Sequence, residues 1–242
     1  MGWLVSFGEH AEVGRRRYEQ RLSEIEGLPR GEFLRHKRDL LNEPTVAFWR
    51  STSPSAGSRA IDELGLIPDE LRALLNQTDG IVNLVATRQM LELQIFGVEG
   101  IRQYKAMAAD LVVRDELFPP VFRKLLIFGN DFGHRLLATW VDDTMKSVPV
   151  LLVDTEKREI LVISHSFGLF FQRVAFALSH EIPFRIGARS QQLREFITRS
   201  EPGPTYPPKL KGQTQFLFDD VGGFPRAWQS LLSEGDRSFR LD

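Results

Sequence analysis

Two glycines and an aspartate follow an apolar run in the stretch "LLIFGNDFGHRLLATWVDD" (125–143). Loops of this composition bind phosphate when their backbone N–H groups lie at the N-terminus of a following helix. Here the next segment has the pattern of another strand, and neither the GxxxxGK[ST] nor the GxGxxG spacing is present. We therefore expect residues 129–133 to form a turn between two strands, without a bound nucleotide or phosphate.

The remaining polar residues that could support catalysis or bind metal do not have the required spacing. In "HEIPF" (180–184), Phe184 occupies the position where a second metal-binding histidine would follow one helical turn later. In "SHSFG" (164–168), the glycine that a nucleophile elbow needs before its serine is missing, so Ser166 is better explained as a helix N-cap, although a base from elsewhere in the fold could still reach a serine. The histidines are scattered singly, at 10, 36, 134, 165 and 180.

Composition excludes further kinds of site. The chain has no cysteine, which excludes disulfides, thiolate nucleophiles and cysteine metal ligands. Its acidic pairs, at 142–143 and 219–220, point apart in extended structure and are best explained as solvated turns. We therefore predict a non-catalytic protein without a metal or cofactor, and keep an enzyme with a dispersed site as an alternative.

The charge balance argues against a nucleic-acid or membrane partner. The 242 residues include 31 basic and 32 acidic ones, a net charge of −1, so no global field attracts anions. The triplet at 15–17 is basic, but Glu12 and Glu19 lie within one turn of it, which favours a solvated helix face over a nucleic-acid site. The apolar patch at the start is too short for a signal peptide, and no apolar run is long enough to span a bilayer, so we expect a cytoplasmic protein.

Periodicity predicts an α+β fold with a mainly antiparallel sheet of about five strands flanked by helices. The predicted strands are 91–96, 124–128, 135–141, 148–153 and 159–164. The links between the last four are short and lack a helical pattern, so they should form an antiparallel meander. Phenylalanines at helical spacing after Ser166 predict an apolar helix over 166–179 that packs on the sheet.

Helices are also predicted on both sides of this core. An amphipathic helix is expected over 9–26, a short strand at "TVAFW" (45–49) and a loop or domain boundary in the Ser/Pro/Gly-rich residues that follow. Pro68, Leu71, Leu74 and Leu75 predict a helix whose left-handed cap is Gly80. Further helices are expected over 98–111, 189–199 and 224–235.

The order of these elements resembles the SUKH superfamily, the Smi/Knr-like proteins. The similarity rests on the Pro68 helix with its Asp79-Gly80 end, the "IFGNDFG" turn, the strand end at Asp154, and Ser166-Phe167 at the start of the last helix. It implies an α+β core over 60–180 without an active site. The flanking segments, 1–59 and 181–242, have no counterpart and are expected to form an N-terminal helical extension with a linker and a C-terminal extension.

The resemblance also implies a binding role. If the chain is like the bacterial members, the resemblance implies an immunity protein that neutralises a cognate polymorphic toxin, often a nuclease. If it is like the fungal members, the resemblance implies a regulatory scaffold in cell-wall synthesis or signalling. Residues 61–178 contain 16 acidic and 12 basic residues, a net charge of −4, which would steer a basic toxin toward them. The expected contact residues are Asp131, Trp140, Asp142 and Asp143, with a core position as the alternative for Trp140.

Overall fold

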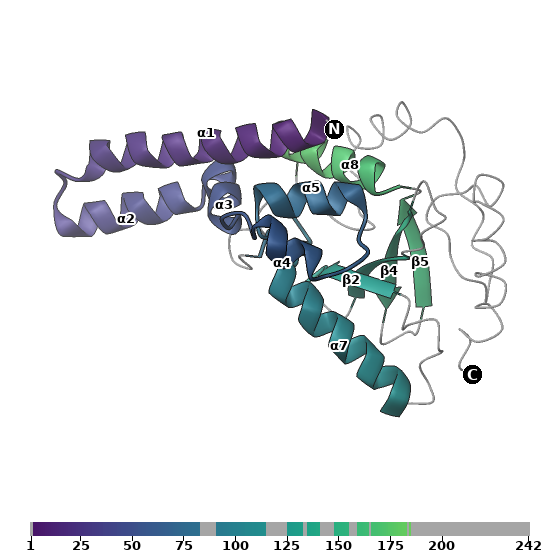
Figure 1. Cartoon of the computed structure of the whole chain (residues 1–242). Coiled ribbons are helices and arrows are strands. Elements are labelled where there is room, and N and C mark those ends of the chain that lie inside the picture. Colours follow the sequence, from purple (N-terminus) through teal and green to yellow (C-terminus); the bar gives the residue numbers. More distant parts are fainter. Residues whose placement is uncertain are drawn as a thin grey trace.

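The computed structural model describes residues 2–82, 91–114, 125–132, 135–140, 148–154, 159–164, 166–182 and 184. These residues form an α+β fold in which helices surround a five-stranded antiparallel sheet (Figure 1). No helix in these ranges combines the length and the apolar character needed to cross a membrane. The helices are α1 (Gly2–Ile25), α2 (Arg30–Leu41), α3 (Pro44–Ser51), α4 (Ser58–Asp62), α5 (Asp69–Gln77), α7 (Val98–Arg114) and α8 (Phe167–Ser179).

The sheet is the meander that the apolar runs predict. Its strands are β1 (Gln94–Ile95), β2 (Leu125–Asn130), β3 (Arg135–Trp140), β4 (Val150–Asp154) and β5 (Glu159–Ser164), each antiparallel to the next. A bulge interrupts the β2–β3 register between Ile127 and Gly129. At Gly129 an added Cβ would lie 2.2 Å from the Gln94 carbonyl oxygen, so β1 can approach β2 only because this residue is glycine.

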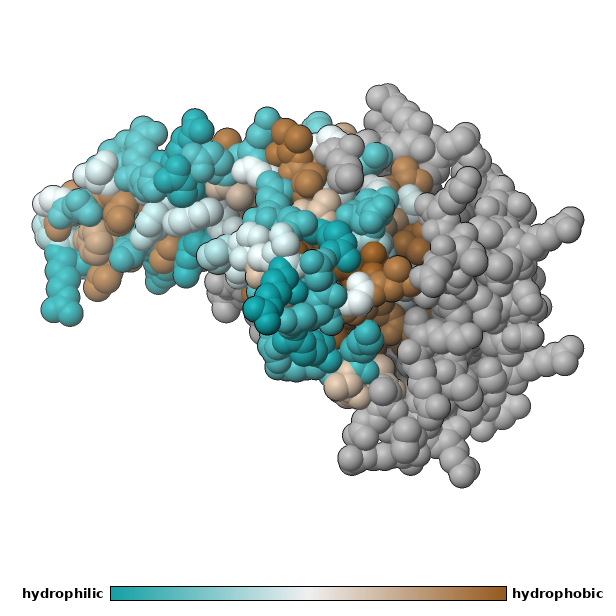
Figure 2. All heavy atoms as spheres, in the orientation of Figure 1, coloured by the Kyte–Doolittle hydropathy of each residue, from teal (hydrophilic) through white to brown (hydrophobic). Residues whose placement is uncertain are grey.

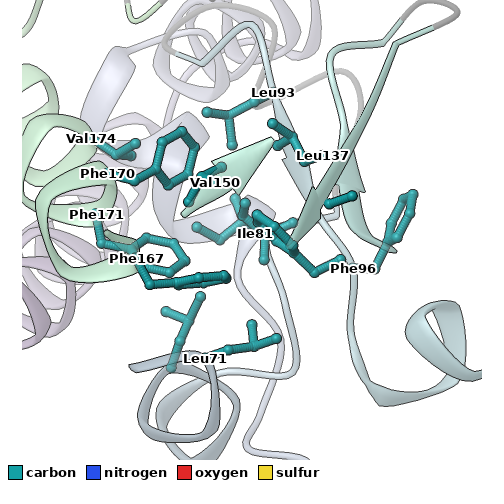
Figure 3. Close-up of a cluster of buried hydrophobic side chains, with 14 of the residues drawn as sticks. Leu71, Ile81, Leu93, Phe96, Leu137, Val150, Phe167, Phe170, Phe171 and Val174 are labelled. Carbon is teal, nitrogen blue, oxygen red and sulfur yellow. The ribbon is translucent and has the colours of Figure 1, made fainter. Parts of the chain in front are cut away.

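Helix α8 packs on the sheet through its phenylalanines. The ring of Phe167 lies 4.7 Å from that of Phe128 on β2, and the helix also buries Phe170 and Phe171 (Figure 3). The Ser166 hydroxyl accepts a hydrogen bond from the Leu169 N–H at 3.1 Å, which confirms the predicted N-cap. Packing on one face and capping at the start therefore determine where α8 lies.

Helix α1 belongs to the same hydrophobic core and is longer than the 9–26 segment predicted from periodicity. The Trp3 ring stacks on Phe171 at 4.7 Å, and Phe7 packs against Phe48 on α3. Further along the helix, a Cβ on Gly14 would lie 2.1 Å from the Thr45 carbonyl oxygen. The two helices can therefore pack this closely only with glycine at this position.

A side chain from α5 inserts into the first turns of α1. The Gln77 amide donates to the Leu4 carbonyl at 3.0 Å and accepts from the Gly8 N–H at 3.1 Å. In a regular helix these two backbone groups bond to each other. Gln77 thus links α1 to the end of α5 with two hydrogen bonds, so the N-terminal segment is joined to the predicted core by polar as well as apolar contacts.

The predicted strand at 45–49 is wrong, because this segment lies within helix α3. Pro44 occupies the first helical position, where its missing N–H costs nothing. The β-branched and aromatic residues that suggested a strand are instead buried against α1 and neighbouring elements, Val46 and Phe48 almost completely. Tertiary burial outweighs the modest strand propensity of these residues.

The turn after α5 has the left-handed glycine that the sequence predicts, in a different role. Helix α5 ends at Gln77, the capping residue Thr78 is extended, and Gly80 has φ +85°. A Cβ at Gly80 would lie 2.5 Å from the Gly97 nitrogen, so glycine is needed for close backbone approach as well as for its φ angle. The helices predicted at 189–199 and 224–235 lie outside the described residues.

Candidate protein-binding surface

The turn between β2 and β3 is stabilised by its own polar groups. The carboxylate of Asp131 is buried and forms an ion pair with the Arg135 guanidinium, and its Oδ1 accepts from the Arg135 N–H at 3.3 Å. The Asn130 side chain accepts from the N–H of Phe132, which has the left-handed φ of +63°. In this conformation Asp131 therefore stabilises the turn, whose predicted position between two strands is confirmed.

The structure places two of the four predicted contact residues, Asp131 and Trp140, at opposite ends of β3. Asp131 lies beside the turn at one end of β3, whereas Trp140 ends the strand and is paired with Leu125. A strand rises about 3.3 Å per residue, so the length of β3 puts roughly 17 Å between them. The Trp140 side chain and residues Asp142 and Asp143 lie outside the described residues. The sheet therefore keeps Asp131 away from Trp140.

Much of the acidic charge on the described part of the core is paired with arginine. Around α4 and α7, Asp62 lies 2.5 Å from Arg72, while Glu63 and Glu99 lie 3.1 and 3.0 Å from Arg102. These pairs are exposed, so each contributes about 0–1 kcal/mol to stability. They nevertheless reduce the local field that could steer a basic partner.

Asp79 is an exception among these carboxylates, because it has a structural role. Its Oδ1 accepts a hydrogen bond from the Val98 N–H at 2.7 Å, at the first residue of α7. A carboxylate at a helix N-terminus satisfies a free backbone donor and interacts favourably with the helix dipole. Asp79 therefore fixes the start of α7 rather than forming part of a binding surface.

Helix α2 and the C-terminal half of α1 lie side by side and project from the rest of the protein, as Figure 1 shows; we call α1 and α2 together the arm. The arginine triplet on α1 is neutralised within the protein. Arg15 bonds Glu12 at 2.7 Å and Glu19 at 2.8 Å, Arg16 bonds Glu12 at 2.8 Å, and Arg17 pairs with Glu43. These pairs agree with the solvated helix face predicted for the triplet.

Glu12 shows the effect of this network most clearly. Hydrogen bonds from Arg15 and Arg16 lower the pKa of the Glu12 carboxyl to about 2. The bond between Glu12 and Arg15 also raises the pKa of the Arg15 guanidinium. Both groups therefore stay charged, and paired with each other, throughout the neutral range.

Helix α2 differs from α1 in the pairing of its charges. Its Arg30 and Lys37 form no ion pair with any described residue, and Arg38 approaches Asp39 only at 3.9 Å. Leu34, in the middle of these cations, is 55% exposed. Figure 2 shows the arm as a largely hydrophilic surface interrupted by isolated hydrophobic residues. Sequence reasoning missed this face, although its residues follow the i, i+4 and i+7, i+8 spacing of one helical side.

One titratable group lies at the junction of α1 and α3. The half-buried ring of His10 meets Phe48 edge-on at 5.3 Å, and its Nε2 is buried without a hydrogen-bond partner among the described residues. Burial lowers the pKa of His10, while the carboxylate of Glu181 acts in the opposite direction. His10 is therefore a packing residue in its neutral form. In the described ranges, no three His, Cys, Asp or Glu side chains are placed to hold a metal ion.

Comparison with known proteins does not identify a family. No protein-family model matches the chain, and no curated protein matches it significantly.

Proposed function

We propose that this protein is an immunity protein of the SUKH type, which neutralises a cognate toxin domain by stoichiometric contact. The supporting observation is the order of its elements. Helix α5, the β2–β3 hairpin, the meander through β5 and the Ser166-capped α8 follow one another in the arrangement that the sequence resemblance implies. Fold similarity alone does not specify function, so the proposal needs a direct binding test.

The end of β3 is the part of the core that we assign to the toxin. Trp140, Asp142 and Asp143 combine an aromatic side chain with two carboxylates, the residue types that form anchors and steer a basic partner. Asp131 is set aside in this assignment because its carboxylate is engaged by Arg135. The meander supports the site, since β3 lies between β2 and β4 in the sheet.

Coexpression with the product of the neighbouring gene tests this proposal. We expect that gene to encode a toxin and the two proteins to copurify as a complex. The double variant Asp142→Asn/Asp143→Asn should slow association, and added salt should weaken the wild-type complex more than the variant complex. Asp131→Asn is the control, because it removes one carboxylate charge from the other end of β3 and should lower the melting temperature without slowing association. A neighbouring toxin that does not bind the folded chain would contradict the proposal.

The projecting arm favours a second candidate function. A regulatory scaffold of the Smi/Knr type would bind its partners through segments outside the core, and residues 1–59 include such an exposed segment. The two functions differ in gene context and in the surface used. The gene of a scaffold should have no toxin gene beside it. Binding of the partners should be lost when exposed residues of the arm are substituted and kept when Asp142 and Asp143 are substituted.

A further inference from the structure

The exposed side of α2 combines unpaired positive charge with an apolar centre. We propose that Arg30, Leu34, Lys37 and Arg38, which we call the α2 face, bind an acidic protein surface that has an apolar recess of about leucine size. This inference goes beyond the proposed immunity function, because it concerns a different surface and a partner of opposite charge, and it specifies the part of the arm that the second candidate function would use. It does not require the toxin to exist.

The spacing of these residues places them on one side of the helix. Leu34 follows Arg30 by four residues and precedes Lys37 and Arg38 by three and four, so the cations surround it. The acids of α2, Glu32 and Asp39, fall on the opposite side because each is offset from Leu34 by about 140–160° around the helix. Three of the four basic residues of α2 thus lie around Leu34, while the fourth, Arg35, falls on the side of the two acids.

The contrast with α1 distinguishes this face from an ordinary solvated one. On α1 the arginines at 15, 16, 17 and 21 each lie near a glutamate, at 2.8 Å for Arg21 and Glu24. The α2 face has only the distant Arg38–Asp39 approach within the described part of the chain. Its charges are therefore available to a partner without first breaking internal ion pairs, so binding avoids that cost.

The arm also holds the α2 face in a fixed conformation. Leu40 on α2 and Ile25 on α1 are buried, which anchors the helix at both ends of the hairpin. The Lys37 ammonium lies 5.5 Å from the centre of the Phe33 ring, which restricts its side chain while leaving its charge on the surface. A preorganised helix loses little conformational entropy on binding.

The composition of the face favours a protein partner. Arginine around a desolvated apolar residue is characteristic of protein interfaces. A nucleic acid would place Leu34 against phosphates and bases, and single-strand binding sites use aromatic platforms instead. An amphipathic helix that binds membranes needs a broad apolar face, whereas Phe33 and Leu40 here are turned into the arm and leave mainly Leu34 exposed.

The test measures binding of defined probes to the full chain. The probe is a helical peptide with an alanine–leucine stripe between two rows of glutamate, and its affinity is measured by fluorescence anisotropy and mapped by backbone amide shifts. Leu34→Ser should weaken binding about tenfold, a loss of about 1.4 kcal/mol, because it removes the apolar side chain that the partner would bury. Arg30→Glu/Arg38→Glu should weaken it at least about tenfold, and a lysine version of the peptide should bind this variant better than it binds the wild type.

Control variants carry the same kinds of substitution at other exposed positions. Val5→Ser changes a valine that is 60% exposed on α1, and Arg59→Glu reverses an arginine on α4 whose side chain is 96% exposed. Neither should change peptide affinity, and circular dichroism should show that every variant is folded. Absence of saturable peptide binding, or equal losses in the controls, would overturn the proposal. Binding of an oligonucleotide or of phosphatidylserine vesicles that Leu34→Ser leaves unchanged would overturn it in favour of a simple polyanion site.

Discussion

The docking of α1 on the core leads to a prediction about stability. Trp3 is 5% exposed, stacks on Phe171 at 4.7 Å and meets Phe7 edge-on at 5.8 Å. A buried tryptophan removes about 150–250 Å² from water, worth about 4–6 kcal/mol at ~25 cal/mol per Å². An alanine side chain retains part of this burial free energy, and the surrounding side chains relax into the space that is left. Trp3→Ala should therefore lower the free energy of unfolding by about 3–5 kcal/mol.

Urea denaturation followed by far-ultraviolet circular dichroism measures this change. With a slope of about 1–3 kcal/mol per M, the midpoint should fall by about 1 M or more, and the α1 helix should unfold in the same transition as the sheet. Val5→Ala is the control, because exposed substitutions usually change stability by less than about 0.5 kcal/mol. A loss below about 1 kcal/mol for Trp3→Ala, or a separate early transition, would mean that 1–59 is a detachable extension and would refute the reasoning.

Three further predictions concern local contacts. Gly14→Ala places a Cβ 2.1 Å from the Thr45 carbonyl oxygen and should cost about 1–3 kcal/mol in thermal melting, whereas Gly31→Ala, where the added Cβ meets open space, should be neutral or stabilise by about 0.5–1 kcal/mol. Ser166→Ala removes the N-cap bond of α8 and should cost about 1 kcal/mol, restored in Ser166→Asp or Ser166→Thr; equal stability of Ser166→Ala and the wild type would disprove the capping role. Because burial lowers the pKa of His10 from 6.5, the stability that its neutral form provides above that pH is lost as the pH falls through the lower folded value. Replacing His10 with Gln should therefore reduce the loss of melting temperature between about pH 7 and pH 5, and an unchanged pH dependence would contradict its burial.

The sheet was predictable because each strand has a strong local signal. Runs such as 124–128 and 148–153 are apolar, lie close together in sequence and leave no room for a crossover helix, so an antiparallel meander was the simplest arrangement. Ser166 followed by phenylalanines at helical spacing identified α8 and its start in the same way. These are features that a short window of sequence contains.

Elements that depend on distant contacts were harder to predict. The segment at 45–49 is helical because α1 covers it, and no window around Val46 and Phe48 contains that information. The beginning of α1 was predicted too late, although Trp3, Phe7 and Gly14 already follow the spacing of its buried face. Trp3 and Phe7 also lie in the apolar patch that is too short for a signal peptide, so the helix signal and the targeting signal overlap in this segment.

The candidate site also has features that the sequence predicts and others that only the structure shows. The meander predicts that Asp131 and Trp140 lie at opposite ends of β3, so their separation could have been derived from the predicted strands alone. The pairing of Asp131 with Arg135 depends on the side-chain conformation within the turn, which spacing does not determine. The grouping of three cations around Leu34 was visible in the sequence, but the exposure of this face required knowledge of how α2 packs on α1.

A stoichiometric titration tests the proposed immunity function most directly. The toxin that the proposed function expects beside this gene is held at a fixed concentration well above the dissociation constant, and its activity is measured as the purified chain is added. The proposed function predicts that activity falls linearly to zero at one equivalent and that Asp131→Asn behaves in the same way. Trp140→Ala should leave residual toxin activity at one equivalent, because it binds more weakly, while its melting curve remains cooperative. Complete inhibition far below one equivalent would indicate turnover and an enzyme, and full toxin activity with excess folded chain would contradict the immunity function.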